Sequence, residues 1–344
     1  MTLESTATGK PFVHHHAAHC ESGVTSAFFR DKGVDISEPM VFGIGSGIFF
    51  GYLPFIKPAG MTITTFRSQP GAIFRKAARR LGGDFVVKTY RNPQKGMDEL
   101  RQVLKTGQIV GLKTNLYWLT YFSERFRFNF SGHNLIVLRE IENGFRISDP
   151  TLEHPVDCPA ADLQRARFAH GPMEAHGYMY YLTSVNPTPD LRGACIRGMK
   201  DSCNLMLKIP LPIFGIRGIR FLARKIIAIP DKIDFKEACR FLADIIRWLE
   251  DTGTGGAGFR YMYAAFLQEA AELFDSAELA GLSEEMTAIG HDWRNFSIVS
   301  TRIIKQRNTS EETFAKAGGL VMNCAGREEA FFKNLQKVVR KLKA

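Results

Sequence analysis

The stretch Gly132-His-Asn-Leu-Ile-Val-Leu-Arg-Glu-Ile-Glu-Asn-Gly-Phe-Arg-Ile-Ser-Asp-Pro150 contains the clearest structural signal in the chain. Residues 134–140 and 145–147 are runs rich in strand-forming residues, and Asn143-Gly144 between them is the dipeptide that a tight hairpin turn favours. We therefore expect two adjacent antiparallel strands. A further apolar run at residues 109–115, with turn residues on both sides, is expected to be another strand.

Three helices are expected before this hairpin, because each of three segments with helical patterns is followed by glycine, which commonly ends a helix. The segments span about residues 20–30, 71–81 and 97–105. A histidine and an aspartate lie at the open end of the hairpin: His133 opens one strand and Asp149 closes the next. The two are not in strict register, but the turn folds the two ends of the hairpin toward each other.

A cysteine occupies the start of the first expected helix, in the motif His19-Cys20-Glu21-Ser22-Gly23. Unpaired backbone amides and the helix dipole at such a position stabilise a thiolate, which is the form that attacks carbonyl groups. A nucleophilic cysteine also needs a base and a group that orients the base. His133 and Asp149 have the residue types for these roles, and the sequence therefore predicts a Cys-His-Asp site. Each residue alone also fits an ordinary structural role as a buried thiol, a strand-edge imidazole or a strand cap.

The chain resembles the family of the butirosin biosynthesis protein H N-terminal domain over roughly residues 12–185. The motifs that carry the resemblance are His19-Cys20-Glu21-Ser22, Gly33, Ser37-Glu38, Gly43-Ile-Gly-Ser-Gly47, and the GHNLIVL and ISDP segments of the hairpin. The resemblance implies a papain-like thiol acyltransferase, because the named member takes an aminoacyl group from an acyl carrier protein thioester and delivers it to an amine. It further implies that Cys20 forms the acyl-enzyme, His133 transfers the proton and Asp149 orients His133.

One departure concerns the oxyanion hole. Papain-like enzymes usually place a glutamine about six residues before the cysteine, and here that stretch is His14-His15-His16. An imidazole N–H or the Cys20 amide is the alternative donor, so the oxyanion hole is left unassigned and His15 and His19 are candidate substrate-binding residues. No metal site is expected, because three contiguous histidines cannot turn all their side chains toward one ion.

The charge and element pattern changes near residue 190. The segment Asn186-Pro-Thr-Pro-Asp190 combines two prolines with turn-forming residues and is the expected linker. We therefore expect an α+β chain with two domains. Residues 1–188 would form a papain-like Cys-His-Asp acyltransferase domain, and residues 189–344 a mainly α-helical domain for donor or acceptor binding or for docking.

Two glycine-rich segments invite ligand interpretations. Gly43-Ile-Gly-Ser-Gly47 lacks the following helix and the later acidic residue of a dinucleotide loop, so we expect these glycines to permit close packing or positive φ instead. Gly253-Thr-Gly-Gly-Ala-Gly258 leads directly into a strong helical pattern. Gly255, Gly256 and Arg260 are therefore candidates to bind a phosphopantetheine phosphate or a polar substrate. The alternative is a flexible connection between helices.

Positive charge is concentrated in residues 191–232, where nine basic and two acidic residues give a net charge of +7, within a chain whose net charge is +10. Basic and apolar residues alternate there, so one face is expected to be cationic. Such a face suits an acidic carrier protein or a membrane surface, and packing within the domain is the ordinary explanation. Nucleic acid is not an expected partner, because no recognition motif accompanies the charge.

Six cysteines without a CxxC pair argue against a disulfide framework, so we expect reduced thiols. Neither a membrane-spanning run nor a secretory signal is evident, so we expect a cytoplasmic protein. No tightly bound cofactor is expected. The favoured function is a thiol acyltransferase that uses a carrier-protein or CoA thioester donor and a small-molecule amine or hydroxyl acceptor, in secondary-metabolite or lipid biosynthesis. The alternatives are a cysteine peptidase or amidase with the same triad and a non-catalytic binding protein.

Overall fold

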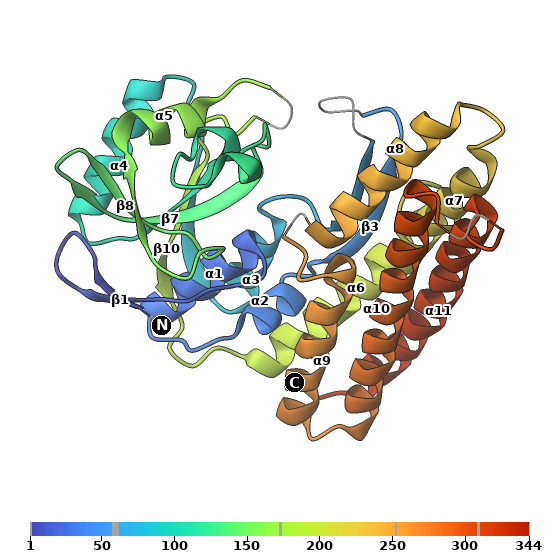
Figure 1. Ribbon diagram of the computed structural model, residues 1–344. Helices are drawn as coiled ribbons and strands as arrows, with labels where there is room; N and C mark the ends of the chain where they lie inside the picture. Colours follow the sequence, from blue (N-terminus) through green and yellow to red (C-terminus); the bar gives the residue numbers. More distant parts are fainter. Residues whose placement is uncertain (1, 57–61, 172–173, 252, 308–309, 344) are drawn as a thin grey trace. The chain divides into compact units, whose positions relative to one another are not determined.

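The computed structural model describes residues 2–56, 62–171, 174–251, 253–307 and 310–343 (Figure 1). These residues form two compact units. The first unit consists of the chain up to residue 41 and from 74 to 189, and the second consists of 42–73 and the chain from 190 onward. The α+β fold class is confirmed, because the first unit contains a six-stranded sheet and the second is mainly helical.

The expected continuous domain over residues 1–188 differs from these units at residues 42–73, which cluster with the helical unit. This insert contains the hairpin of β3 (Ile48–Leu53) and β4 (Ile63–Arg67), and its fully buried rings of Phe50 and Phe66 pack on Trp293 of the helical unit with centroid separations of 6.2 and 5.4 Å. Burial of these aromatic rings explains why the insert joins that unit.

The sheet of the first unit is antiparallel throughout, with the strand order β5-β10-β6-β7-β8-β9. Its strands are β5 (Gly83–Lys88), β6 (Val110–Thr114), β7 (His133–Ile141), β8 (Gly144–Ser148), β9 (Val156–Pro159) and β10 (Met179–Val185). A separate two-stranded sheet pairs β1 (Thr2–Ser5) with β2 (Pro11–His14).

The predicted hairpin is confirmed as β7 and β8, whose pairing runs from Ile141 opposite Gly144 to Ile136 opposite Ser148. His133 pairs with Thr114 on the neighbouring strand β6. The last pair of the hairpin joins Ile136 and Ser148. His133 lies three residues before Ile136, and Asp149 lies one residue after Ser148. As expected, the two residues lie at the open end without being in register.

Helices cover both faces of this sheet (Figure 1). The helices α4 (Pro93–Lys105) and α5 (Ala160–Phe168) pack on one face, and their core contains apolar side chains of β6, β7, β8 and β10. On the other face lie α1 (Cys20–Asp31) and α3 (Ala72–Arg80), where Phe28 packs edge-on against Phe74 and Tyr180. The predicted helices at about 20–30, 71–81 and 97–105 thus correspond to α1, α3 and α4. The 3₁₀ turns η2 (Leu116–Trp118) and η3 (Glu124–Phe126) lie between β6 and β7.

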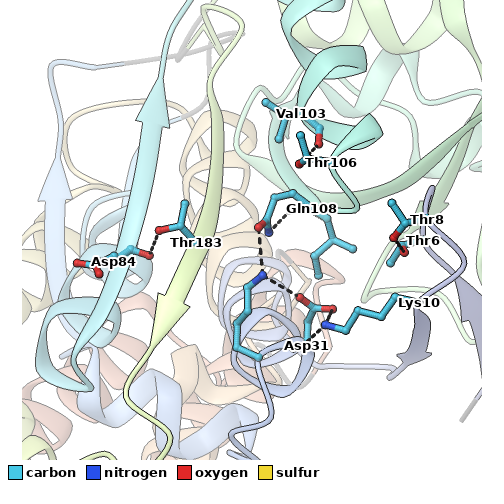
Figure 2. Close-up of polar contacts among 11 residues, drawn as sticks. Thr6, Thr8, Lys10, Asp31, Asp84, Val103, Thr106, Gln108 and Thr183 are labelled. Carbon is cyan, nitrogen blue, oxygen red and sulfur yellow. Dashed lines mark hydrogen bonds and ion pairs between the residues drawn. The ribbon is translucent and has the colours of Figure 1, made fainter.

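The carboxyl end of α1 is fixed by ion pairs. The side chain of Asp31 is buried, and its carboxylate lies 2.8 Å from Lys10 Nζ and 3.4 Å from Lys32 Nζ. Lys32 also donates to Gln108 Oε1 at 3.1 Å, and Figure 2 shows Lys10, Asp31 and Gln108 gathered at this end of the helix. These contacts hold α1 to the segments before β2 and β6, and so help to fix the helix that begins at Cys20.

The second unit consists of the β3–β4 hairpin and a set of long helices. Its helices are α6 (Leu191–Leu207), α7 (Gly215–Ala228), α8 (Phe235–Ile246), the π-helical turn η4 (Arg247–Asp251), the 3₁₀ turn η5 (Ala257–Phe259), α9 (Arg260–Phe274), α10 (Ala277–Ile304) and α11 (Phe314–Lys341). The chain first enters this unit within α2 (Glu38–Ile44). Helix α11 packs against α6, α7 and α10.

The glycines at positions 43–47 serve close packing, as one of the two sequence interpretations predicts. A Cβ atom on Gly43 would lie 2.1 Å from the Phe266 ring, so a larger residue would collide there. Across the parts of the chain that the structure describes, no helix is long and apolar enough to span a bilayer.

Candidate active site

Cys20 is the first residue of α1, and His19 caps this helix. The His19 ring accepts from the Ser22 backbone amide at 3.3 Å and also bonds the Ser22 hydroxyl at 2.9 Å. All six cysteines lie in described segments, and Cys20 alone among them is partly exposed. The predicted nucleophile is therefore at a helix start, where a thiolate is favoured, and within reach of a substrate.

The turn that leads to Cys20 is held by the carboxylate of Glu38, the first residue of α2. This carboxylate accepts from the backbone amides of Ala18 at 2.9 Å and His19 at 2.8 Å, and from the Ser22 hydroxyl at 2.9 Å. Burial raises the pKa of Glu38 above its usual value, although the three hydrogen bonds oppose that shift. Ser37-Glu38 is one of the motifs that carry the family resemblance, but the sequence indicated no role for Glu38.

His133 and Asp149 form a close buried pair. His133 Nε2 donates to Asp149 Oδ2 at 2.6 Å, and the side chains are 6% and 0% exposed. Because Nε2 faces the carboxylate, Nδ1 is the ring nitrogen left for the Cys20 side chain, which also bonds the imidazole. The hairpin and the start of α1 thus bring together the three residues that the sequence predicts for the site.

The electrostatics of the pair favour an ion pair. Burial by itself would lower the pKa of His133, but the charge and hydrogen bond of Asp149, together with the Cys20 side chain, raise it above the ordinary histidine value. Burial would raise the pKa of Asp149, but His133 and Thr151 outweigh that effect and lower it. The imidazolium and the carboxylate therefore each stabilise the charged form of the other.

Two further residues hold Asp149. Its Oδ1 atom accepts from the Thr151 amide at 3.0 Å and hydroxyl at 2.7 Å, while Oδ2 accepts from the Tyr121 hydroxyl at 2.8 Å. The Asp-Pro-Thr sequence carries a signal for the first contact, since aspartate commonly bonds the backbone two residues later. No local pattern indicates Tyr121, which lies in an irregular segment 28 residues away from Asp149.

The residue after His133 also reaches the thiol. Asn134 Nδ2 lies 3.6 Å from Cys20 Sγ, and Asn134 Oδ1 accepts from the Tyr180 hydroxyl at 2.9 Å. Asn134 belongs to the predicted hairpin, but its local sequence did not mark it as a site residue.

The histidines before Cys20 differ in their surroundings. His14 is fully buried, and its two ring nitrogens bond Ser148 Oγ at 2.8 Å and the Leu152 carbonyl oxygen at 2.9 Å. His15 is half-buried, and burial followed by the nearby Arg30 lowers its pKa. Substrate binding by His15 and His19 stays a prediction. Among the described residues, no group of three or more His, Cys, Asp or Glu side chains is arranged to hold a metal ion.

The candidate anion site of the second unit needs a correction. Arg260 is fully buried, and its guanidinium donates to the two Glu328 oxygens at 2.9 Å each and to the Gly258 carbonyl oxygen at 2.7 Å. Phe66 and Trp293 also contact this guanidinium, with ring centroids 5.4 and 5.3 Å away. Arg260 is thus a structural residue of the core and is not placed to bind a phosphate.

The glycines before Arg260 serve the backbone conformation. Gly255 and Gly256 have φ values of +66° and +85°, which favour glycine, and the Gly256 amide donates to Thr254 Oγ1 at 3.1 Å. The Ala257 amide donates to the Glu250 carboxylate at 3.1 Å. The amides of Gly256 and Ala257 are thus already engaged by groups of the same unit.

The basic segment 191–232 forms α6, α7 and the loops after them. The apolar face of α7 is buried within the unit, so its charged residues are what it presents at the surface. Some of the charge is already paired, since Arg220 bonds Glu329 and Arg197 lies 3.5 Å from Asp190. Arg217 and Arg224 are exposed.

Two family models match the chain, and their bounds differ from those of the compact units, because the second match begins within α5 of the first unit. Residues 19–150 match the family described as "Butirosin biosynthesis protein H, N-terminal", and residues 161–335 match the family described as "Domain of unknown function (DUF4872)". The comparison with curated proteins gives no match. Among solved structures, a protein from Bacillus anthracis described as a C39-like peptidase is 16% identical, with a TM-score of 0.35 over 54% of this chain and 100% of that one.

The match to the butirosin family includes Cys20, His133 and Asp149, whose side chains form one chain of contacts. The second match spans half of the chain. The chain therefore belongs to the DUF4872 family, and residues 19–150 are similar to the N-terminal region of the butirosin biosynthesis protein H family.

Proposed function

We propose that the chain is a thiol acyltransferase that moves an acyl or aminoacyl group through a Cys20 thioester to an amine or hydroxyl of a small molecule. The observation that carries the proposal is the contact chain from the partly exposed Cys20 through His133 to the buried carboxylate of Asp149. The match to a family named for butirosin biosynthesis favours synthesis over degradation.

In the first half of the reaction, Cys20 Sγ attacks the carbonyl carbon of the donor thioester. The tetrahedral intermediate collapses, the bond to the donor sulfur breaks, and His133 gives its proton to the departing thiolate. The products are the acyl-Cys20 thioester and a free donor thiol. Asp149 keeps the imidazole in position and stabilises its charged form.

In the second half, His133 removes a proton from the acceptor amine or hydroxyl as this group attacks the acyl-Cys20 carbonyl. The carbon–sulfur bond then breaks, which releases the amide or ester and restores the thiolate beside the imidazolium. Water in place of the acceptor would give hydrolysis, the reaction of a peptidase or amidase. The same three residues serve both outcomes, so the acceptor determines the reaction class.

The donor in this proposal is the phosphopantetheine thioester of an acyl carrier protein or of CoA, and no tightly bound cofactor takes part. Carrier proteins are acidic, and the surface of α6 and α7 carries exposed basic side chains such as Arg217 and Arg224. We assign carrier docking to this basic surface. Contact with an anionic membrane surface is the competing assignment.

Intact-protein mass spectrometry after incubation with acyl-carrier-protein and acyl-CoA thioesters tests the proposal. We expect the mass of one acyl group on the wild type, none on Cys20→Ala, and an unchanged adduct on Cys158→Ala, which removes a buried thiol of the same unit. Addition of amines should then discharge the adduct faster than water does. Discharge by water alone would make the chain a hydrolase, and absence of any adduct would favour a non-catalytic binding protein.

Site-specific thiol labelling supplies an independent check on the nucleophile. Burial raises the pKa of Cys158, Cys195 and Cys203 to about 12 and also raises that of Cys239 and Cys324. Iodoacetamide near neutral pH should therefore modify Cys20 first. Peptide mapping that finds another cysteine labelled as fast would contradict the assignment.

A further inference from the structure

A thioester carbonyl develops negative charge on its oxygen when a thiolate attacks it, and a fixed hydrogen-bond donor at that oxygen lowers the barrier. The position that usually supplies a glutamine donor in papain-like enzymes is held by the histidine run of residues 14–16. His14 cannot serve there, because Ser148 and the Leu152 carbonyl engage its two ring nitrogens in the interior. His14 therefore does not supply this donor, and groups that lie close to Cys20 Sγ are the candidates to be considered.

Asn134 is the second residue of β7, and successive residues of a strand face opposite sides of the sheet. The side chains of Leu135 and Val137 enter the core beneath α4 and α5, so Asn134 faces the side that carries α1. There its Nδ2 atom lies 3.6 Å from Cys20 Sγ at the start of that helix. The strand that presents His133 thus also presents an amide to the nucleophile.

The orientation of this amide is fixed by its other contacts. Nδ2 lies 3.1 Å from the carbonyl oxygen of Gly132, which can only accept, so the nitrogen of the amide must face it. On the opposite side, Oδ1 accepts from the Tyr180 hydroxyl at 2.9 Å. An amide nitrogen carries two hydrogens, and with one directed at Gly132 the second is directed at Sγ. Asn134 is only 4% exposed, so water competes little for this donor.

We propose that Asn134 is a catalytic residue whose Nδ2–H donates to the oxyanion of the tetrahedral intermediate at Cys20. During attack, negative charge moves from Sγ to the carbonyl oxygen of the carbon that is bonding to Sγ. A donor in contact with Sγ can follow that charge by a small shift toward the oxygen. Tyr180 is a positioning residue, because its hydroxyl anchors the amide without contact to the reacting atoms.

The inference rests on the proposed acyl chemistry, and two reactions of Cys20 separate it from a merely structural role. Acylation by p-nitrophenyl acetate passes through an oxyanion. Alkylation by iodoacetamide displaces iodide from a saturated carbon and forms no oxyanion. Asn134→Leu should therefore slow acylation by about 10²- to 10³-fold, whereas the plateau rate of alkylation at alkaline pH should change little.

Two other variants complete the test. Tyr180→Phe keeps Asn134 but removes its anchor, so it should slow acylation less than Asn134→Leu and leave alkylation unchanged. Ser26→Ala is the matched control, since it removes another buried hydrogen bond of α1, from Ser26 Oγ to the Ile36 carbonyl oxygen at 2.7 Å, without touching the site. Both reactions should proceed normally in this control. Thermal melts of each variant establish that it is folded.

Equal loss of acylation and alkylation in Asn134→Leu would reduce Asn134 to a structural role and overturn the inference, as would unchanged acylation in that variant. If Asn134→Leu does not fold, the inference is decided by Tyr180→Phe, and acylation at the wild-type rate there overturns it. A wild type that p-nitrophenyl acetate acylates but thioesters do not would contradict the proposed donor class and leave the Asn134 result valid. A wild type that neither reagent acylates would overturn both proposals.

Discussion

At the candidate site, the Cys20 thiol contacts the His133 imidazole, which in turn contacts the Asp149 carboxylate. Of these three groups, the carboxylate is the most deeply buried. Asp149 is fully buried and accepts four hydrogen bonds, from His133, Tyr121 and Thr151. Its charge is therefore fixed in place, and it determines the protonation of the imidazole. The pH dependence of the site should report this coupling.

We predict that acylation of Cys20 stays fast at pH values well above 6.5, the ordinary pKa of histidine, because Asp149 raises the pKa of His133 and keeps it protonated as the acid for the leaving group. Asp149→Asn removes the charge that raises this pKa. The alkaline limb of the acylation profile should then move to lower pH. A pH profile of single-turnover acylation for both proteins measures the shift, and coincident limbs would show that Asp149 does not control His133.

The same pair contributes to stability with a defined sign. A raised histidine pKa stabilises the fold below the unfolded value of 6.5 and loses that effect as pH rises through the folded value. A lowered aspartate pKa stabilises above 3.8 and loses the effect as pH falls through the folded value. The free energy of unfolding of the wild type in urea should therefore exceed that of Asp149→Asn by the largest amount between pH 3.8 and pH 6.5.

At the scale of elements, the start of α1 depends on α2. The Glu38 carboxylate at the first turn of α2 bonds the Ala18 and His19 amides and the Ser22 hydroxyl. These three donors lie just before and just inside the helix that begins at Cys20. A second segment of the chain thus fixes the backbone that carries the nucleophile, which local helix capping alone would not do.

We predict that Glu38→Ala lowers the free energy of unfolding by about 2 kcal/mol and slows alkylation of Cys20. The Ala18 and His19 amides and the Ser22 hydroxyl would then lose the carboxylate that accepts their hydrogen bonds. Glu38→Gln should be milder, since one of its two oxygens remains. Urea unfolding and iodoacetamide kinetics measure the two effects. The exposed Glu142 offers a control, and Glu142→Ala should change neither. Wild-type alkylation in Glu38→Ala would show that α2 does not position Cys20.

At the scale of the whole molecule, each compact unit has its own core. The core of the first unit lies between the sheet and helices α4 and α5. In the second unit, a buried ion pair between Arg260 on α9 and Glu328 on α11 is enclosed by Phe66 and Trp293, and the Trp293 indole donates to Glu328 at 2.6 Å. This cluster ties the β3–β4 insert to the helices of that unit.

We predict that Glu328→Leu destabilises the protein by about 3–5 kcal/mol, because it leaves the guanidinium of Arg260 buried without a counter-charge. The double variant Arg260→Met with Glu328→Leu should recover most of the loss. Urea unfolding of the two single variants and the double variant measures the coupling. Lys341→Met breaks an exposed ion pair with Glu278 and should have little effect. Strictly additive losses would show that the two buried charges are not coupled.

The proposed docking of an acidic carrier protein depends on long-range attraction to the net charge of +7 over residues 191–232. Salt should slow acylation by a carrier-bound donor but not by a small pantetheine thioester, since the screening length is only about 10 Å at 0.1 M salt. Arg217→Gln with Arg224→Gln should reproduce this selectivity. Arg220 is left in place because it pairs with Glu329. Equal effects on both donors would exclude docking at this surface, and loss of vesicle binding alone would favour the membrane.

Local patterns in the sequence were sufficient for the elements that carry the site. The Asn143-Gly144 turn and the flanking apolar runs predicted β7 and β8, and glycines after helical segments predicted the ends of α1 and α4. Because a hairpin turn fixes which residues meet, the sequence by itself brings His133 and Asp149 to the same end of the hairpin. The position of Cys20 at a helix start followed from the same local signals.

Contacts between distant segments were decided by tertiary structure. Glu38, Tyr121 and Tyr180 reach the site from other elements, and nothing in their local sequence indicates the partners that they bond. The predicted role of Arg260 in anion binding is wrong for the same reason, since its partner Glu328 is 68 residues away along the chain. Short-range patterns determine where helices, strands and turns form. The partner of a buried polar group depends on which elements pack together, which only the folded chain decides.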